Sequence, residues 1–196
     1  MFTTKPKLAR QMLVRALAAG VPCAWVVGDS VYGADYALRR WIEQQRRGYV
    51  LTVTSGQRLG LARVDDWVAD LPPTAWQRLS AGDGSKGPRL YDWAYVPCRS
   101  DAAPGWRKGL LIRRKPAKPA DLTFYLTLAP QGTPLITLVR VAGTRWTIEA
   151  CFEAAKGEVG LDDYEVRSWT GWHRHITLAM LGHAYLAVLR KAAIGG

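Results

Sequence analysis

Hydrophobic and polar positions recur with two different periods over the first 55 residues of the chain. Apolar residues at helical spacing predict a helix that begins with Thr4 as its cap and ends at Gly20, and a second helix over residues 34–47. Two short apolar runs, residues 23–28 and 49–54, predict buried strands. Helix, strand, helix and strand in this order indicate a mostly parallel sheet that is covered by helices.

The pattern changes after residue 55, and glycine and proline are frequent as far as residue 134. Alternating apolar and polar residues in this region predict antiparallel hairpins, and residues 64–71 predict one short helix. The alternating stretches are residues 89–96, 109–113 and 122–128. From residue 135 to residue 193 the chain has few helix breakers, and it is predicted to be helical.

The charge of the chain indicates a polyanionic partner. Lys and Arg number 27 against 16 Asp and Glu, which gives a formal net charge of +11. A surface this basic binds phosphate backbones, because binding releases their counterions. One basic run, over residues 107–118, is interpreted either as a solvated hairpin face or as a non-specific DNA contact. We therefore expect nucleic acid as the partner.

Cys23, Cys98 and Cys151 are far apart and form no Cys-x2-Cys pair. An odd, scattered set argues against a disulfide framework and against a zinc site. No uninterrupted apolar run reaches the roughly 18 residues that a membrane span requires, and the first residues lack the apolar core of a signal peptide. We expect reduced cysteines, no membrane partner and a cytoplasmic protein.

Asp29 is the first candidate for a catalytic residue. It directly follows the strand predicted over residues 23–28, and ligands of open α/β sheets bind at the carboxyl ends of strands. An acid at this position would therefore face the usual site. Because Asp followed by Ser is also a common start of a helix, a capping role for Asp29 is the structural alternative.

A second constellation lies in the predicted C-terminal helices. Arg145, Glu149 and Lys156 are spaced so that they share one stripe of a helix, within roughly 40° of one another. The neighbouring stripe is apolar and is expected to be buried, which would place Glu149 at the rim of the buried face. That apolar stripe consists of Ile148, Phe152, Ala155 and Val159. The alternative is an ion-pair ladder on an exposed helix.

Taken together, these features resemble the bacterial insertion-sequence DDE transposases. A strand that ends in Asp29, a β-rich region and a helix carrying Arg-x3-Glu-x6-Lys follow one another in the order of that family. Two further stretches, residues 26–33 and 164–175, resemble one branch of it. The resemblance spans nearly the whole chain.

The resemblance implies an α/β fold in three parts. A partial RNase H-like core, with its opening strands missing, would occupy residues 1–55. A β-rich insertion would occupy residues 56–134. The helical C-terminal part of the catalytic core would occupy residues 135–196.

The resemblance also implies a site and a reaction. Asp29 corresponds to the second catalytic acid and Glu149 to the third, and both would bind Mg²⁺ or Mn²⁺, while Arg145 and Lys156 would hold DNA phosphates. Carboxylates are the hard ligands that Mg²⁺ prefers, and two such ions can stabilise the attacking and leaving oxygens of an in-line displacement. The implied reaction is hydrolysis at the end of a transposon, followed by attack of its 3′-OH on target DNA. The implied partners are those DNAs and, when the protein is intact, a second copy in a homodimer.

The sequence departs from the family pattern at two points. Ala142 stands where the family has a Tyr, three residues before Arg145. Asp29 is the first acidic residue of the sequence, so the first acid of the family has no counterpart here. We therefore expect an N-terminally truncated, catalytically incomplete transposase, whose strands over residues 23–28 and 49–54 lack partners and form an exposed edge. The alternative function is a non-catalytic DNA-binding remnant that could interfere with intact transposase.

Three histidines and two tryptophans are further candidates for chemistry. His173, His175 and His183 lack the i, i+4 spacing of metal ligands on a helix, and they are interpreted as packed polar residues. Trp146 and Trp172 are candidates for stacking on a displaced base. A small α/β hydrolase is the alternative outside nucleic-acid chemistry, but the sequence has no Gly-x-Ser-x-Gly motif to support it.

Overall fold

The computed structural model describes residues 3–84, 87–98, 101–165 and 167–194. The chain divides into two compact units, Met1–Arg145 and Trp146–Gly196. The elements of the first unit are α1 (Lys5–Ala18), β1 (Trp25–Gly28), α2 (Ser30–Gly33), α3 (Tyr36–Gln44), β2 (Gly48–Val53), β3 (Arg58–Leu59), β4 (Ala62–Arg63), α4 (Asp66–Ala69), a 3-10 turn (Pro73–Ala75), β5 (Gln77–Gly84), β6 (Gly87–Pro97), β7 (Trp106–Lys115) and β8 (Lys118–Pro130). Helix α5 (Leu135–Val159) begins in the first unit and ends in the second, where α6 (Trp169–Ile194) follows it.

The predicted helices and strands are confirmed in type and order. The two N-terminal strands are β1 and β2, and the alternating stretches of the middle region lie in β6, β7 and β8. The short helix predicted over residues 64–71 is α4, and the C-terminal part is helical as expected. Val166, within a stretch that carries the family resemblance, lies outside the described residues.

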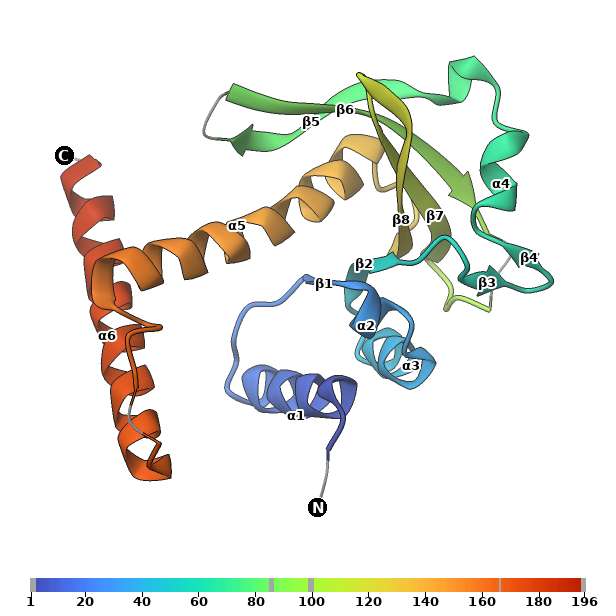
Figure 1. Ribbon diagram of the computed structural model, residues 1–196. Coiled ribbons are helices and arrows are strands. Elements are labelled where there is room, and N and C mark those ends of the chain that lie inside the picture. The colour runs from blue at the N-terminus through green and yellow to red at the C-terminus, as the bar shows by residue number, and fades with distance from the viewer. Residues whose placement is uncertain (1–2, 85–86, 99–100, 166, 195–196) are drawn as a thin grey trace. The chain divides into compact units, whose positions relative to one another are not determined.

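The main sheet has six strands in the order β1-β2-β8-β7-β6-β5 (Figure 1). Strands β1 and β2 are parallel, and every other pair in this sheet is antiparallel. The expectation of a mostly parallel sheet is therefore wrong, because the hairpins that follow β2 return to it and extend the same sheet. Strand β8 pairs with β2 from Tyr49↔Leu128 to Val53↔Phe124, so β2 does not lack a partner and only β1 of the two N-terminal strands is an edge.

The two faces of this sheet are both buried, which follows from the alternation of side chains along each strand. On one face, Leu51 and Val53 of β2 join a cluster with Ile42 of α3. On the other face, Val50 joins a second cluster with Leu138 of α5. A strand covered on both faces reads as a continuous apolar run, which explains the run in β2.

Helix α1 begins as predicted, except for its cap. Thr4 occupies the N-cap position with an extended backbone, but its side chain makes no capping hydrogen bond. Pro6 stands at the second position of the helix and has no N–H to donate, so one of the two usual donors to a cap is missing. The helix ends before Gly20, which has a φ of 73° that favours glycine.

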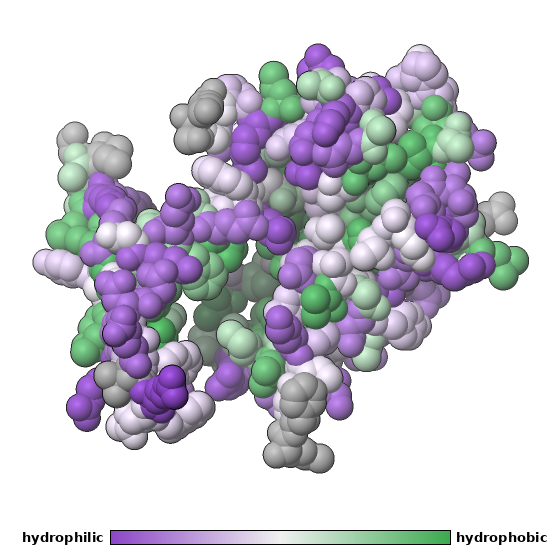
Figure 2. Space-filling model, viewed as in Figure 1, coloured by the Kyte–Doolittle hydropathy of each residue, from purple (hydrophilic) through white to green (hydrophobic). Residues whose placement is uncertain are grey.

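The second unit is a pair of helices with little buried surface. Among its described residues only Ala155 and Ala179 are buried. Figure 2 shows green, hydrophobic side chains interspersed with purple ones on the segment that Figure 1 labels α6. The exposed large apolar side chains of α6 include Leu178, Met180, Leu181, Tyr185, Val188 and Leu189. In the part of the chain that the structure describes, no helix has both the length and the apolarity that crossing a membrane requires.

Candidate active site

Asp29 lies at the carboxyl end of β1 and is exposed. It is the N-cap of α2, and its Oδ1 accepts a hydrogen bond of 2.9 Å from the backbone N–H of Val31. The capping role weighed from the sequence is therefore confirmed. The capping hydrogen bond occupies Oδ1 of Asp29. Within the described residues, the other carboxylate oxygen, Oδ2, has no hydrogen bond or ion pair. The cap thus orients the carboxylate without occupying both of its oxygens.

A close packing of α2 on β2 holds this turn. Gly33, the last residue of α2, lies so close to β2 that an added Cβ would overlap the carbonyl oxygen of Thr52. Gly28, just before Asp29, has Leu51 and Tyr32 within about 3.2 Å of the position that its Cβ would take. A side chain at position 33 would collide with the backbone of β2, so this glycine allows α2 to lie against β2 just after Asp29.

Arg145, Glu149 and Lys156 all lie on α5, as predicted. Glu149 and Lys156 are exposed and Arg145 is half-buried. Nζ of Lys156 forms an ion pair of 3.3 Å with Oδ2 of Asp162, and both side chains are about half exposed. An exposed pair of this kind contributes little free energy, so a phosphate could displace Asp162 from Lys156 at small cost.

The apolar stripe beside these residues differs from the expectation. Ala155 is buried, but the exposed fractions of Ile148 and Phe152 are 53% and 55%. The helical spacing was therefore right, and the prediction that the whole stripe is buried was wrong. Helical period shows which residues share a face, but it does not show what covers that face.

The candidate acids belong to different units, with Asp29 in the first and Glu149 in the second. Among the described residues, no group of three or more His, Cys, Asp or Glu side chains is arranged to hold a metal ion. Arg145, the last residue of the first unit, shares α5 with Glu149. A common site of Asp29 and Glu149 thus remains a proposal.

The three histidines have separate environments in the second unit. Nε2 of His175 lies 2.9 Å from the carbonyl oxygen of Gly160. The ring of His173 packs edge-on against Trp169 and Trp172, with centroids 4.2 and 4.9 Å away. Nε2 of His183 lies 3.3 Å from Sγ of Cys151.

The two tryptophans weighed for base stacking are both accessible. The exposed fractions of Trp146 and Trp172 are 38% and 43%. Trp172 stacks on Trp169, with ring centroids 6.1 Å apart. A role of either ring in binding a displaced base stays a prediction.

Most cations of the basic run 107–118 have partners inside the first unit. Lys108 is paired with acids, Arg114 lies 3.3 Å from Asp92, and Lys115 lies 2.6 Å from Asp121. Arg113 and Arg107 lie over the rings of Tyr91 and Tyr95. These contacts favour the structural interpretation of the run, because much of its charge is already balanced within the protein.

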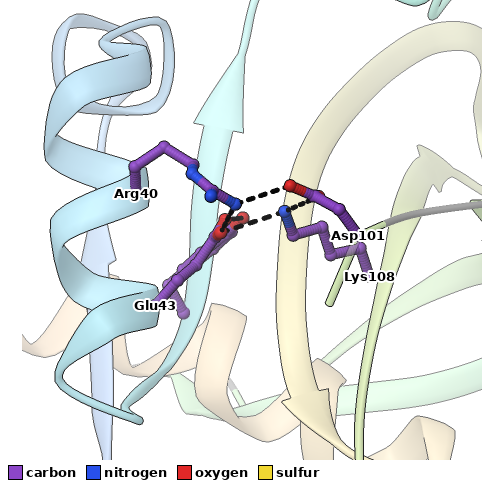
Figure 3. Close-up of polar contacts among 5 residues, drawn as sticks. Arg40, Glu43, Asp101 and Lys108 are labelled. Atoms are coloured by element: carbon purple, nitrogen blue, oxygen red, sulfur yellow. Dashed lines mark hydrogen bonds and ion pairs between the residues drawn. The ribbon is translucent and has the colours of Figure 1, made fainter. Parts of the chain in front are cut away.

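An ion-pair cluster in the first unit was not predicted from the sequence. Figure 3 shows Glu43 of α3 and Asp101 bridged by Arg40 and Lys108. Nζ of Lys108 lies 3.0 Å from Glu43 and 2.9 Å from Asp101, while Nη1 of Arg40 lies 3.0 and 2.7 Å from the same two acids. The hydrogen bond from Lys108 lowers the pKa of Asp101. In the sequence, only the spacing of Arg40 and Glu43 by three residues on one helix predicts an ion pair of this cluster. The contacts with Asp101 and Lys108 join residues that are far apart in the chain.

The cluster borders a cleft of about 660 Å³ in the first unit. Tyr36, Arg39 and Trp67 are among its lining residues. Burial raises the pKa of Cys98, on the same cleft, to about 11. Glu43 and Asp101 also line the cleft, but each is held by two cations, unlike the carboxylate of Asp29. We therefore place the candidate active site at Asp29.

Comparison with known proteins adds one finding. Residues 1–90 match the family model of the DDE superfamily endonucleases. The matched segment includes β1, Asp29, α3 and β2, and ends within β6. A search of curated proteins found no match. The match supports a relation to DDE transposases and endonucleases, whose members act on DNA and generally use divalent metal ions.

Proposed function

We propose that this chain contributes two carboxylates, Asp29 and Glu149, to the site of a DDE transposase that cleaves and transfers DNA strands. The observation that carries the proposal is the exposed Asp29 at the end of the parallel strand β1, inside the segment that matches the DDE endonuclease family. The order of Asp29 and the Arg-x3-Glu-x6-Lys helix along the chain agrees with it.

The proposal includes a fold assignment. The parallel pair β1-β2 with α2 and α3 would belong to an RNase H-like core over residues 1–55. The hairpins over residues 56–134 would form its β-rich insertion, and residues 135–196 would complete the core with helices.

The residues of the site would have distinct tasks. Asp29 and Glu149 would hold the metal ions, while Arg145 and Lys156 would bind the DNA phosphates beside the scissile bond. Cations next to the acids neutralise phosphate and limit the repulsion between carboxylates. The pair of Lys156 with Asp162 would open when phosphate binds.

The donor atoms suit Mg²⁺ or Mn²⁺. Both proposed ligands are exposed carboxylates, and hard oxygen ligands are those that such ions prefer. A bound ion would stabilise charge on the attacking and leaving oxygens of the phosphoryl transfer. Two carboxylates are fewer ligands than such an ion usually takes, so further oxygens from DNA, water or another acid would complete the coordination.

The substrates would be transposon ends and target DNA. A homodimer that bridges two transposon ends would be the working form. The net charge of +11 favours association both with transposon ends and with target DNA.

A DNA cleavage assay tests the proposal. The substrate would be a plasmid carrying the DNA that flanks the coding sequence, with Mg²⁺ or Mn²⁺ present. The assay would be run with this 196-residue chain and with a chain extended by any in-frame coding sequence found upstream of Met1. We expect Asp29→Asn and Glu149→Gln each to abolish metal-dependent cleavage. The matched control is Glu153→Gln, an exposed acid one turn further along α5, which should leave cleavage intact.

Cleavage that survives both substitutions would contradict the assignment of the two acids. DNA binding without cleavage, by both the 196-residue chain and the extended chain, would favour the second candidate function. That candidate is a non-catalytic DNA-binding protein that could interfere with intact transposase, and the basic net charge is the observation that favours it.

A further inference from the structure

Cys151 and His183 form a thiol–imidazole pair inside the second unit. Cys151 lies on α5 and His183 on α6, 32 residues further along the chain, and Sγ lies 3.3 Å from Nε2. Neither residue belongs to the proposed catalytic set. Cys151 is exposed, so small molecules in solution can reach its sulfur.

One nitrogen of the imidazole contacts the thiol. Nδ1 of His183 is buried and has no hydrogen-bond partner among the described residues. Nε2 is therefore the nitrogen that can exchange a proton with Cys151. A base within hydrogen-bond distance of a thiol is the arrangement that activates cysteine nucleophiles.

The other two cysteines lack this arrangement. Cys23 and Cys98 are half-buried, and their sulfurs lie 3.6 and 3.9 Å from the backbone carbonyl oxygens of Trp25 and Val96. Burial raises the pKa of Cys98 to about 11, which keeps that sulfur protonated near neutral pH. Of the three thiols, Cys151 alone combines exposure with a histidine ring nitrogen at contact distance within the described residues.

We propose that Cys151 is a modification site that exchanges with small disulfides, with His183 as its proton acceptor. As Sγ attacks one sulfur of the disulfide, the thiol proton passes to Nε2 of His183. The S–S bond of the reagent breaks and a new S–S bond forms to Cys151. The leaving sulfur departs as a thiolate and takes the proton from His183, so a thiol and a disulfide yield a mixed disulfide and a thiol.

The modification would act on the contact between the two helices. The two helices touch near this pair, since Val159 of α5 lies 3.4 Å from the position that a Cβ of Gly182 would take on α6, which is ordinary van der Waals contact. A group attached to Cys151 would lie where α5 and α6 meet, and we expect it to loosen the helix pair. The pair would thus respond to the thiol–disulfide balance of its surroundings.

The test measures the modification rate of each cysteine in the reduced 196-residue chain. Oxidised glutathione is the probe, and peptide mass spectrometry separates Cys23, Cys98 and Cys151. We expect Cys151 to react fastest, and His183→Asn to slow it by at least about tenfold, a smaller factor than the roughly 10²–10⁴ that a positioned general base typically contributes. The matched control is His173→Asn, an exposed histidine of the same helix, which should leave the rate unchanged.

Two results would overturn the proposal. One is a Cys151 rate no higher than that of Cys23 and Cys98, and the other is an unchanged Cys151 rate in a folded His183→Asn protein. If His183→Asn fails to fold, the wild-type chain is compared with itself in guanidinium. The advantage of Cys151 should disappear on unfolding, and an advantage that persists would assign it to local sequence rather than to His183.

Discussion

The two units of the chain hold one candidate acid each, but they support it differently. In the first unit, the turn that carries Asp29 rests on a sheet whose side chains are buried on both faces. In the second unit, Glu149 lies on the part of α5 that follows Arg145, and Ala155 and Ala179 are the only buried residues among the described residues of this unit. The first acid is thus positioned by tertiary packing and the second mainly by the helix itself.

This difference shows where the stability of the protein resides. Large apolar side chains removed from water supply most of the folding free energy of a domain, and those are concentrated in the first unit. An isolated helix pair with small buried residues is marginal in water. We therefore expect the first unit to respond strongly to substitutions in its interior and the second unit to respond weakly.

The largest effect is expected for Trp93→Ala. Trp93 is 1% exposed, its Nε1 donates to the carbonyl oxygen of Leu79, and its ring packs against Tyr125. Its truncation should lower the free energy of unfolding by about 3–5 kcal/mol. The matched substitution in the second unit, Leu181→Ala, removes a side chain that is 64% exposed and should change it by less than about 0.5 kcal/mol. Urea unfolding measures both, and a cost for Leu181→Ala as large as for Trp93→Ala would break the comparison.

Replacing Gly33 and Gly157 by alanine should change the free energy of unfolding in opposite directions. In Gly33→Ala the new Cβ would overlap the carbonyl oxygen of Thr52, so we expect a loss of about 1–3 kcal/mol. Gly157, on α5, has no other atom within 4 Å of the position of an added Cβ. Gly157→Ala should stabilise the protein by about 0.5–1 kcal/mol, because alanine favours the helix. Thermal unfolding distinguishes the two signs, and a stabilising Gly33→Ala would refute the close packing of α2 on β2.

The two candidate acids should differ in their effect on stability. Asp29→Ala removes the cap of α2 and should cost about 1 kcal/mol, whereas Asp29→Asn retains a capping oxygen and should cost less. Glu149→Gln, on an exposed helix surface, should change stability by less than about 0.5 kcal/mol. Chemical denaturation of the three variants checks this order. Equal costs for Asp29→Ala and Asp29→Asn would show that the cap contributes nothing.

The effect of Asp92→Asn on stability should depend on pH. Asp92 accepts hydrogen bonds from Arg78 and Arg114, and the bond from Arg78 is the main reason that the pKa of Asp92 is lowered. A lowered folded-state pKa means that the carboxylate stabilises the fold above the unfolded pKa of about 4 and loses this effect as pH falls through the folded value. The stability difference between the wild type and Asp92→Asn should therefore shrink on acidification below about pH 4.

An exposed ion pair of the second unit serves as the comparison for the pH dependence of Asp92→Asn. Glu158 and Arg190 form an ion pair with 31% and 55% of their side chains exposed, so Glu158→Gln should have almost no effect at neutral pH. Denaturant unfolding at several pH values covers both variants. A difference for Asp92→Asn that stays constant with pH would contradict the role of its charge.

Much of the site follows from local pattern. The apolar run before Asp29 predicts a strand that ends at an exposed acid, and the spacing of Arg145, Glu149 and Lys156 predicts their common helix. The cap that Asp29 forms is equally a local feature, since donor and acceptor are two residues apart. Such features depend on neighbours in the chain, and a periodicity is enough to find them.

Other contacts join residues that are far apart in the chain. Lys108 reaches Glu43 only because β8 returns to β2, and Cys151 meets His183 only because α5 and α6 pack together. The exposed state of Ile148 and Phe152 likewise depends on what covers their helix rather than on helical period.

The sequence by itself therefore determined the kinds and order of most of the longer helices and strands, the position of Asp29 at a strand end, and the helix that carries Glu149, whereas α2, β3, β4 and β5 were not predicted. Only the tertiary structure decided that the sheet is mostly antiparallel, which cations are balanced by acids, and which thiol has a histidine beside it. The physical reason is that hydrophobic period and turn residues act over a few neighbours, whereas strand order and side-chain partners are set by how the whole chain buries its apolar surface.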